Sequence, residues 1–222
     1  MSTVRFIGDV HGKTQEYLAI INEPGVEASI QVGDLAFNYD FLKLVSSDNH
    51  VIIPGNHDNY DIIGHNVNSL CPLDNFLHGF GSYFVNGLSF FYTSGAFSID
   101  WYSRLQKERI GYSKSWWSQE ELTIAELRAA VEYYKTTKPD IVVTHDCPKV
   151  VSKQISDGSA LKYFGYHPET FETHTQLALG LMLNVHRPKL WVFGHYHTSF
   201  DKVIEGTRFK CLAELEVYDY EI

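Results

Sequence analysis

The feature that most constrains the fold is a series of short apolar runs, most of which lead into Gly or Thr followed by Asp, Asn or His. The runs occupy residues 4–7, 28–32, 51–53, 88–93, 141–144 and 190–193. Nearly continuous apolar runs of this length are typical of strands that are covered on both faces. The polar segments that follow five of them are "GDVHG", "GDLAF", "GNHD", "THDCP" and "GHYH".

Amphipathic stretches between these runs predict helices over residues 15–22, 118–135 and 168–185. Ser118 and Glu121 match a capping box at the start of the second, and Pro168 suits the first turn of the third. The alternation predicts an α/β fold of layered sheets with helices outside. Because loops at the carboxyl ends of strands gather at one edge in such folds, we expect the polar segments to form one site.

Length and charge limit the organisation and the partners. A chain of 222 residues that is 44% hydrophobic predicts a single domain over residues 1–222. The net charge of -9 provides no basic stripe, so neither long nucleic acid nor a membrane is an expected partner. A small phosphorylated ligand is compatible with this charge, and the sequence does not indicate an oligomeric state.

Cysteine content and the N-terminal segment bear on the compartment. Cys71, Cys147 and Cys211 are odd in number and widely spaced, which favours buried free thiols in a reducing compartment. No segment approaches the ~20 apolar residues that span a bilayer, and the N-terminus lacks a signal-peptide pattern. A cytoplasmic location is therefore expected.

The donor types at the predicted strand ends indicate metal chemistry. Carboxylate, amide and imidazole ligands together suit Mn, Fe, Zn, Co or Ni, whereas a structural zinc site would be rich in Cys. A bridging Asp can hold two ions ~4 Å apart, and such a pair can hold an attacking hydroxide and a phosphoryl oxygen. This chemistry is phosphoester hydrolysis.

The five polar segments, in their order along the chain, resemble the signature of the calcineurin-like metallophosphoesterases. The segments "SGAFSID", "SWWSQEEL" and "THDCP", together with Arg104, are similar to compact bacterial and phage members, so the resemblance covers nearly the whole chain. It implies a layered, metallophosphoesterase-type β-sandwich flanked by helices. It also implies two divalent or trivalent metal ions, with Mn expected to support activity in vitro and Fe, Zn, Co or Ni as alternatives.

The resemblance assigns roles residue by residue. One set would bind the first metal: Asp9, His11 and His197. Asp34 would bridge the two ions. A second set would bind the other metal: Asn56, His145 and His195. A hydroxide shared by the ions would attack phosphorus in line. His57 would protonate the leaving oxygen or hold a substrate oxygen, and Asp58 would orient His57 and favour its charged form.

The sequence departs from some branches of the family. Protein phosphatases and dinucleoside tetraphosphate hydrolases carry an Arg shortly after the second-motif Asp, but residues 35–39 contain none, and Asp58 stands where their third motif has Glu. We therefore expect hydrolysis of a small phosphomonoester or phosphodiester, with nucleotides among the candidates. The alternatives are a catalytically weak scaffold on the same fold, a nuclease, or a protein phosphatase of the superfamily.

Several residues have two interpretations. Arg104 suits either a bidentate phosphate contact or a surface salt bridge. Trp116 and Trp117 suit packing better than base stacking, and Tyr196 suits either an inward orientation or packing. Six further histidines lie outside the motifs and are predicted to be structural: His50, His65, His78, His167, His174 and His186.

Overall fold

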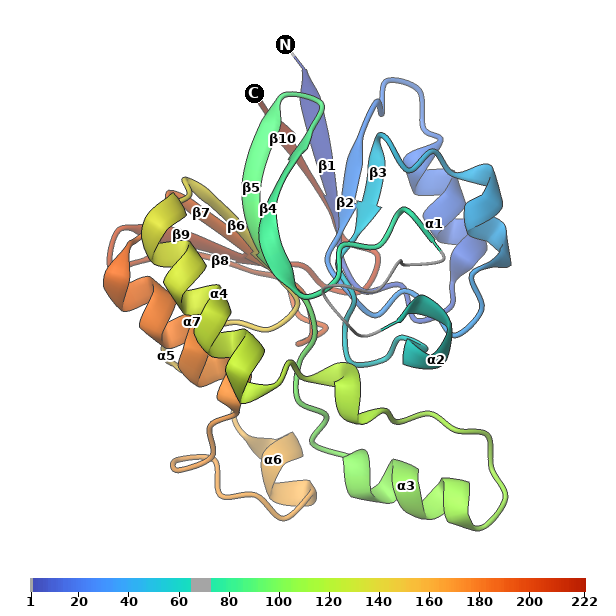
Figure 1. The fold of residues 1–222 in the computed structure, drawn as a ribbon, viewed down its shortest axis with the longest axis vertical. Coiled ribbons are helices and arrows are strands. Elements are labelled where there is room, and N and C mark those ends of the chain that lie inside the picture. The colour runs from blue at the N-terminus through green and yellow to red at the C-terminus, as the bar shows by residue number, and fades with distance from the viewer. Residues whose placement is uncertain (1, 65–72) are drawn as a thin grey trace.

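The computed structural model describes residues 2–64 and 73–222. Its described strands form two sheets (Figure 1). The four-stranded sheet has the order β10 (Val217–Glu221), β1 (Thr3–Ile7), β2 (Ser29–Gln31), β3 (His50–Ile52). The six-stranded sheet has the order β4 (Phe80–Val85), β5 (Leu88–Thr93), β6 (Ile141–Thr144), β7 (Leu190–Phe193), β9 (Thr207–Cys211), β8 (Phe200–Ile204).

Parallel strands form the centre of each sheet, and antiparallel strands lie at edges. In the first sheet β1, β2 and β3 run parallel, and β10 pairs antiparallel with β1. In the second sheet β5, β6, β7 and β9 run parallel between the antiparallel strands β4 and β8. The carboxyl ends of the parallel strands in a sheet therefore lie at one edge, where the polar segments that follow the strands were expected to meet.

The two sheets pack face to face around one apolar core. Phe6 and Ile30 of the first sheet belong to the same buried cluster as Phe90, Val143 and Val192 of the second. This arrangement confirms the predicted layered sandwich. The six predicted strands are all present, with bounds that differ by at most one residue at either end.

Helices cover the outer faces (Figure 1). On the six-stranded sheet, Leu127 of α4 and Met182 of α7 pack with Trp191. On the four-stranded sheet, Tyr17 of α1 packs with Ile52. The helices among the described residues are α1 (Thr14–Ile21), α2 (Tyr60–Ile63), α3 (Trp101–Arg109), α4 (Ile124–Thr137), α5 (Lys149–Ile155), α6 (Ser159–Tyr163) and α7 (His174–Val185), with 3₁₀ turns η1 (Asp40–Leu44) and η2 (Ser118–Glu120). None of these helices has the length and apolar character needed to cross a membrane.

The predicted start of the second helix is wrong. Helix α4 begins at Ile124, because Thr123 and Glu126 form the capping box: Thr123 Oγ1 accepts from the Glu126 N–H at 3.2 Å, and Glu126 Oε2 accepts from the Thr123 N–H at 2.9 Å. Ser118 starts the separate turn η2. Glu121 instead accepts hydrogen bonds from the N–H and hydroxyl of Thr175, both at 2.9 Å, at the start of α7.

The predicted start of the third helix at Pro168 is also wrong. Helix α7 begins at His174, since Thr173 caps it by accepting from the Gln176 N–H at 2.9 Å. The preceding segment contains the short helix α6, which the sequence analysis missed. Among the cysteines, Cys147 and Cys211 are buried and free, as predicted, whereas Cys71 lies outside the described residues.

Candidate metal centre

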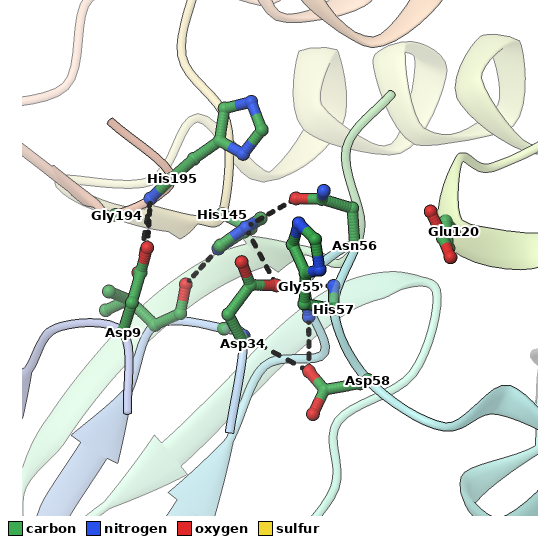
Figure 2. Close-up of polar contacts among 12 residues, drawn as sticks. Asp9, Asp34, Gly55, Asn56, His57, Asp58, Glu120, His145, Gly194 and His195 are labelled. Atoms are coloured by element: carbon green, nitrogen blue, oxygen red, sulfur yellow. Dashed lines mark hydrogen bonds and ion pairs between the residues drawn. The ribbon is translucent and has the colours of Figure 1, made fainter. Parts of the chain in front are cut away.

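Loops after five parallel strands bring the predicted ligands together. Figure 2 shows five of them: Asp9, Asp34, Asn56, His145 and His195. Asp9 follows β1, Asp34 follows β2 and Asn56 follows β3. From the other sheet, His145 follows β6, and both His195 and His197 follow β7. The site therefore lies where the strand ends of both sheets meet.

The first group of predicted ligands is compact. Asp9, His11, Asp34 and His197 each offer a ligand atom within 4.8 Å of the others. The Nε2 atoms of His11 and His197 are 2.8 Å apart, and His197 Nε2 lies 3.3 Å from Asp9 Oδ2. Two imidazole nitrogens and two carboxylate oxygens, one from each of the four side chains, thus lie close enough together to bind one ion.

Asp34 lies between this group and the second one. Its Oδ1 is 3.2 Å from His145 Nε2, and its Oδ2 is 3.8 Å from His11 Nε2. Oδ2 is buried and has no hydrogen-bond partner among the described residues. Because a buried carboxylate oxygen without a hydrogen-bond partner is costly, this atom fits the position of a metal ligand.

The second group is centred on His145. Its Nδ1 lies 2.8 Å from the carbonyl oxygen of Val32, to which it can donate, so Nε2 is left for the site. Nε2 lies 3.0 Å from Asn56 Oδ1, and the ring of His195 lies next to that of His145, with centroids 5.0 Å apart. This group places an amide oxygen and imidazole nitrogens, which can bind a metal, near the Asp34 carboxylate.

Backbone strain is concentrated at the ligands. The described residues include eight non-glycine positions with positive φ, and four of them are predicted ligands: His11 (48°), Asp34 (58°), His195 (70°) and His197 (50°). Such conformations cost on the order of 1–3 kcal/mol each and persist only when the surrounding structure enforces them. Here they turn the side chains into the site directly after their strands.

Glycines in the motifs provide space for the carboxylates. A Cβ on Gly55 would lie 2.2 Å from Asp34 Oδ1, and a Cβ on Gly194 would lie 2.1 Å from Asp9 Oδ1. Both distances are far below van der Waals contact. Gly55 and Gly194 are therefore required, because any larger residue would clash with the carboxylate of a neighbouring loop, Asp34 in the first case and Asp9 in the second.

The charge distribution suits cations. Burial acts to raise the pKa of Asp34, but the nearby His145, His57 and His11 lower it well below its ordinary value. Burial acts to lower the pKa of His145, but Asp34 outweighs it and raises the pKa to about 10. Buried carboxylates, facing imidazoles and a buried carboxylate oxygen without a hydrogen-bond partner among the described residues together fit metal ions of the type that accepts mixed N and O ligands.

His57 lies beside the metal centre, and its main-chain N–H donates to Asp34 Oδ1 at 2.7 Å. The imidazole is close to His11, with ring centroids 5.6 Å apart. Burial lowers the pKa of His57 to about 4, against the opposing effect of Asp34. Burial therefore opposes the charged form of this ring, which was expected from the sequence, while Asp34 favours it.

Asp58 has partners that the sequence analysis did not foresee. Its carboxylate accepts from the main-chain N–H groups of Asp34, Leu35, Ala36 and Gly55 and from the Tyr39 hydroxyl. Figure 2 shows the His57 ring pointing away from this carboxylate. Within the described chain, Asp58 thus holds the Asp34 and Asn56 loops together and does not orient the His57 ring.

Arg104 fits neither of its two predicted interpretations. Its side chain is 5% exposed and pairs with the buried Glu120 at 2.6 Å. It also donates to Ser98 Oγ at 2.8 Å and to the Asn56 carbonyl oxygen at 3.3 Å. Arg104 is therefore part of an internal network behind the Asn56 loop.

Ser98 fixes the orientation of the Asn56 side chain. A serine hydroxyl has one hydrogen to donate and can accept two hydrogen bonds. Arg104 can only donate, so Ser98 accepts from it at 2.8 Å, and the one hydrogen of Ser98 is donated to the Glu120 carboxylate. The contact of Ser98 with Asn56 Nδ2 at 2.9 Å is therefore also one that Ser98 accepts. The Asn56 amide nitrogen therefore faces Ser98, and its oxygen faces His145.

We expect Ser98→Ala to weaken metal binding at the second group by about 10- to 100-fold, the usual effect of removing a group that orients a ligand. Metal titration calorimetry measures this effect. Ser118→Ala, at an exposed serine, is the matched control and should bind metal as the wild type does. Unchanged affinity in Ser98→Ala would show that Asn56 needs no such support.

The sequence did not predict the roles of Ser98 and Glu120 in supporting Asn56, because a serine and a glutamate at these positions form no metal-ligand pattern. The one available signal was that Ser98 follows a predicted strand, residues 88–93. Tyr196 packs against the apolar cluster that includes Phe193 and donates to Asp146 Oδ1 at 2.6 Å. Trp117 is buried, and Trp116 packs against Trp101. Of the six histidines predicted to be structural, His50 contacts Ser29 and His186 contacts the Pro139 carbonyl oxygen, while His65 lies outside the described residues.

The fold and the site together define a class of α/β sandwich in which candidate metal ligands come from loops of both sheets. The sequence model described as calcineurin-like phosphoesterase matches residues 2–199, and the chain belongs to this family. Membership supports a metal-dependent phosphoesterase in general terms and divalent metal ions as its cofactors.

Solved structures share the fold at low sequence identity. Phosphopantetheinyl hydrolase from Mycobacterium tuberculosis is 17% identical, with a TM-score of 0.52 over 96% of this chain and 89% of that one. A dimetal phosphatase from Danio rerio is 11% identical, with a TM-score of 0.50 over 96% and 88%. A putative 5'-nucleotidase from Staphylococcus aureus is 14% identical, with a TM-score of 0.50 over 98% of this chain and 50% of that chain, so the chain spans half of it. No curated protein matches the sequence.

Proposed function

We propose that this protein is a dinuclear metal-dependent phosphoesterase that hydrolyses a small phosphomonoester or phosphodiester. The observation that carries the proposal is the position of Asp34. One carboxylate oxygen lies toward His145, and the other lies toward His11 with no hydrogen-bond partner among the described residues. A single carboxylate with a free oxygen between two groups of donors is suited to bridging two ions.

The chain's own residues would divide the work as follows. Asp9, His11 and His197 would hold one ion, Asn56, His145 and His195 would hold the other, and Asp34 would bind both. Two bound ions supply electrostatic stabilisation of a phosphoryl group and make a nucleophilic water easier to deprotonate. Mn is the ion that we expect to support activity in vitro, with Fe, Zn, Co and Ni as alternatives.

His57 is the proposed catalytic residue outside the metal ligands. It lines the same cavity as Asp34 and Asn56, and its main-chain hydrogen bond fixes the base of the side chain. From there the ring would hold a substrate oxygen or pass a proton to the leaving oxygen. Asp58 is a positioning residue in this scheme, because it holds the loops that carry Asp34 and Asn56.

The test is to strip the purified protein of metal, add back Mn, and compare hydrolysis of p-nitrophenyl phosphate with that of bis-p-nitrophenyl phosphate. We expect Mn to restore turnover by at least about 100-fold over the stripped protein. The preferred compound distinguishes a monoesterase from a diesterase. Two tightly bound ions without turnover of either compound would contradict the proposal and favour a scaffold.

Salt dependence separates a small substrate from long nucleic acid. For a small ester, we expect kcat/KM to change by less than about threefold between about 50 and 200 mM salt, because few charges are involved. A nuclease with 6–10 phosphate contacts would lose roughly 10³–10⁵ in affinity over this range. Rate measurements on the preferred ester and binding measurements on an oligonucleotide at both salt concentrations provide the comparison.

A further inference from the structure

A cavity of about 820 Å³ opens from the proposed metal site. Its inner end is lined by Asp34, Asn56, His57 and His195, and it extends to α5 and α6. Helix α6 projects below the six-stranded sheet (Figure 1). Cavities of about 300–1,000 Å³ typically hold ligands of drug-like size. This cavity therefore offers much more space than a phosphoryl group needs.

The outer part of the cavity has an apolar wall. Six side chains form it: Phe97, Ile99, Ile155, Leu161, Phe164 and Phe171. The rings of Phe97 and Phe171 pack with centroids 5.8 Å apart. Phe97 directly precedes Ser98, the partner of Asn56, so the aromatic wall begins next to the proposed metal ligands.

The apolar residues of α6 are not explained by the core. Helix α6 has no buried residue, and Phe164 at its end is 36% exposed. Leu161 and Phe164 nevertheless both line the cavity. Leu161 and Phe164 thus form part of the cavity wall. Because neither is buried, we expect their substitution to have little effect on folding.

The charged residues of the outer cavity are of both signs. Lys149 and Lys153 line it together with Asp157 and Glu169, and Lys153 pairs with Glu169 at 3.4 Å. Because two positive and two negative side chains lie there together, they give no net attraction for a polyanion. Together with the aromatic wall, this balance of charge favours an uncharged aromatic group as the occupant.

We infer that this cavity binds the organic group of the substrate, and that this group is an aromatic ring system. The inference rests on the proposed function, because it places the phosphoryl group beside Asp34 and His57. The ring then lies against Phe97, Leu161 and Phe164, where it can be sandwiched or packed edge to face. The substrate class is a phosphoester of an aromatic or heteroaromatic compound.

Binding of phosphonates, which cannot be hydrolysed, tests the inference without turnover. Calorimetry on the Mn-reconstituted protein compares benzylphosphonate with methylphosphonate. We expect benzylphosphonate to bind at least about tenfold more tightly, in the range that apolar pockets give for added apolar groups. In Leu161→Ala and Phe164→Ala this ratio should fall at least about fivefold. Val150→Ala on α5 is the control, since Val150 is 47% exposed and does not line the cavity.

The outcomes separate the two proposals. Equal affinity for the two phosphonates, or a ratio that neither variant changes, would overturn the aromatic subsite and leave the phosphoesterase proposal standing. Failure of both phosphonates to bind the metal-loaded wild type would overturn the phosphoryl site, and the aromatic subsite with it.

Discussion

Replacing Asp34 with asparagine is expected to lower kcat by about 10³-fold or more, a loss larger than that from a single hydrogen-bond donor at a reacting centre. Asn is nearly isosteric with Asp, and its side-chain oxygen can still accept from the His57 N–H. The substitution therefore removes the negative charge while it keeps the local hydrogen bond. Steady-state kinetics on the preferred p-nitrophenyl ester, combined with metal analysis by mass spectrometry, measures the effect.

The control for Asp34→Asn is Asp48→Asn, because Asp48 is an exposed carboxylate outside the site. Both variants should fold, and only Asp34→Asn should lose metal and turnover. Full activity of Asp34→Asn with two bound ions would exclude a bridging role for this residue.

His57→Ala is expected to lower kcat by about 10²–10⁴-fold, the usual contribution of a general acid or base. Metal content should remain close to that of the wild type, because the ligand cluster of Asp9, His11, Asp34 and His197 does not include this ring. The main-chain contact to Asp34 is also retained. Kinetics and metal analysis on the same preparation give the two quantities.

His11→Ala is the matched comparison for His57→Ala, since both remove an imidazole beside Asp34. We expect His11→Ala to lose metal and turnover together. If His57→Ala also lost both in equal measure, His57 would have to be reassigned as a ligand or as a structural residue.

The sequence predicted β1, β2, β3, β5, β6 and β7 and the meeting of the polar loops because both depend on local patterns, whereas the strands β4, β8, β9 and β10 were not predicted. A short apolar run followed by Gly and Asp indicates a buried strand and its end, and the sandwich then brings the ends together. The ligand roles remain a proposal that the geometry supports. The prediction of one domain over residues 1–222 remains a prediction as well.

The features that the sequence did not predict depend on contacts between distant segments. The starts of α4 and α7 are fixed by Thr123 and Thr173, whereas a competing pattern at Ser118 is used for a separate turn. Asp58 binds main-chain N–H groups of another loop, and such groups leave no trace in the sequence. Glu120 turns inward because Arg104, from α3, is buried beside it.

The position of the ligands at the meeting of the two sheets has a consequence for the lifetime of the protein. His145 directly follows β6 of the six-stranded sheet, yet it contacts Val32 and Asn56, which follow β2 and β3 of the other sheet. Ions held there would bind only the assembled sandwich, and a ligand that binds only the native state stabilises it by about 2.7 kcal/mol at 100 times its dissociation constant. Scarcity of metal would then increase exposure of the chain to proteases, so the amount of protein, as well as its activity, would follow the metal supply.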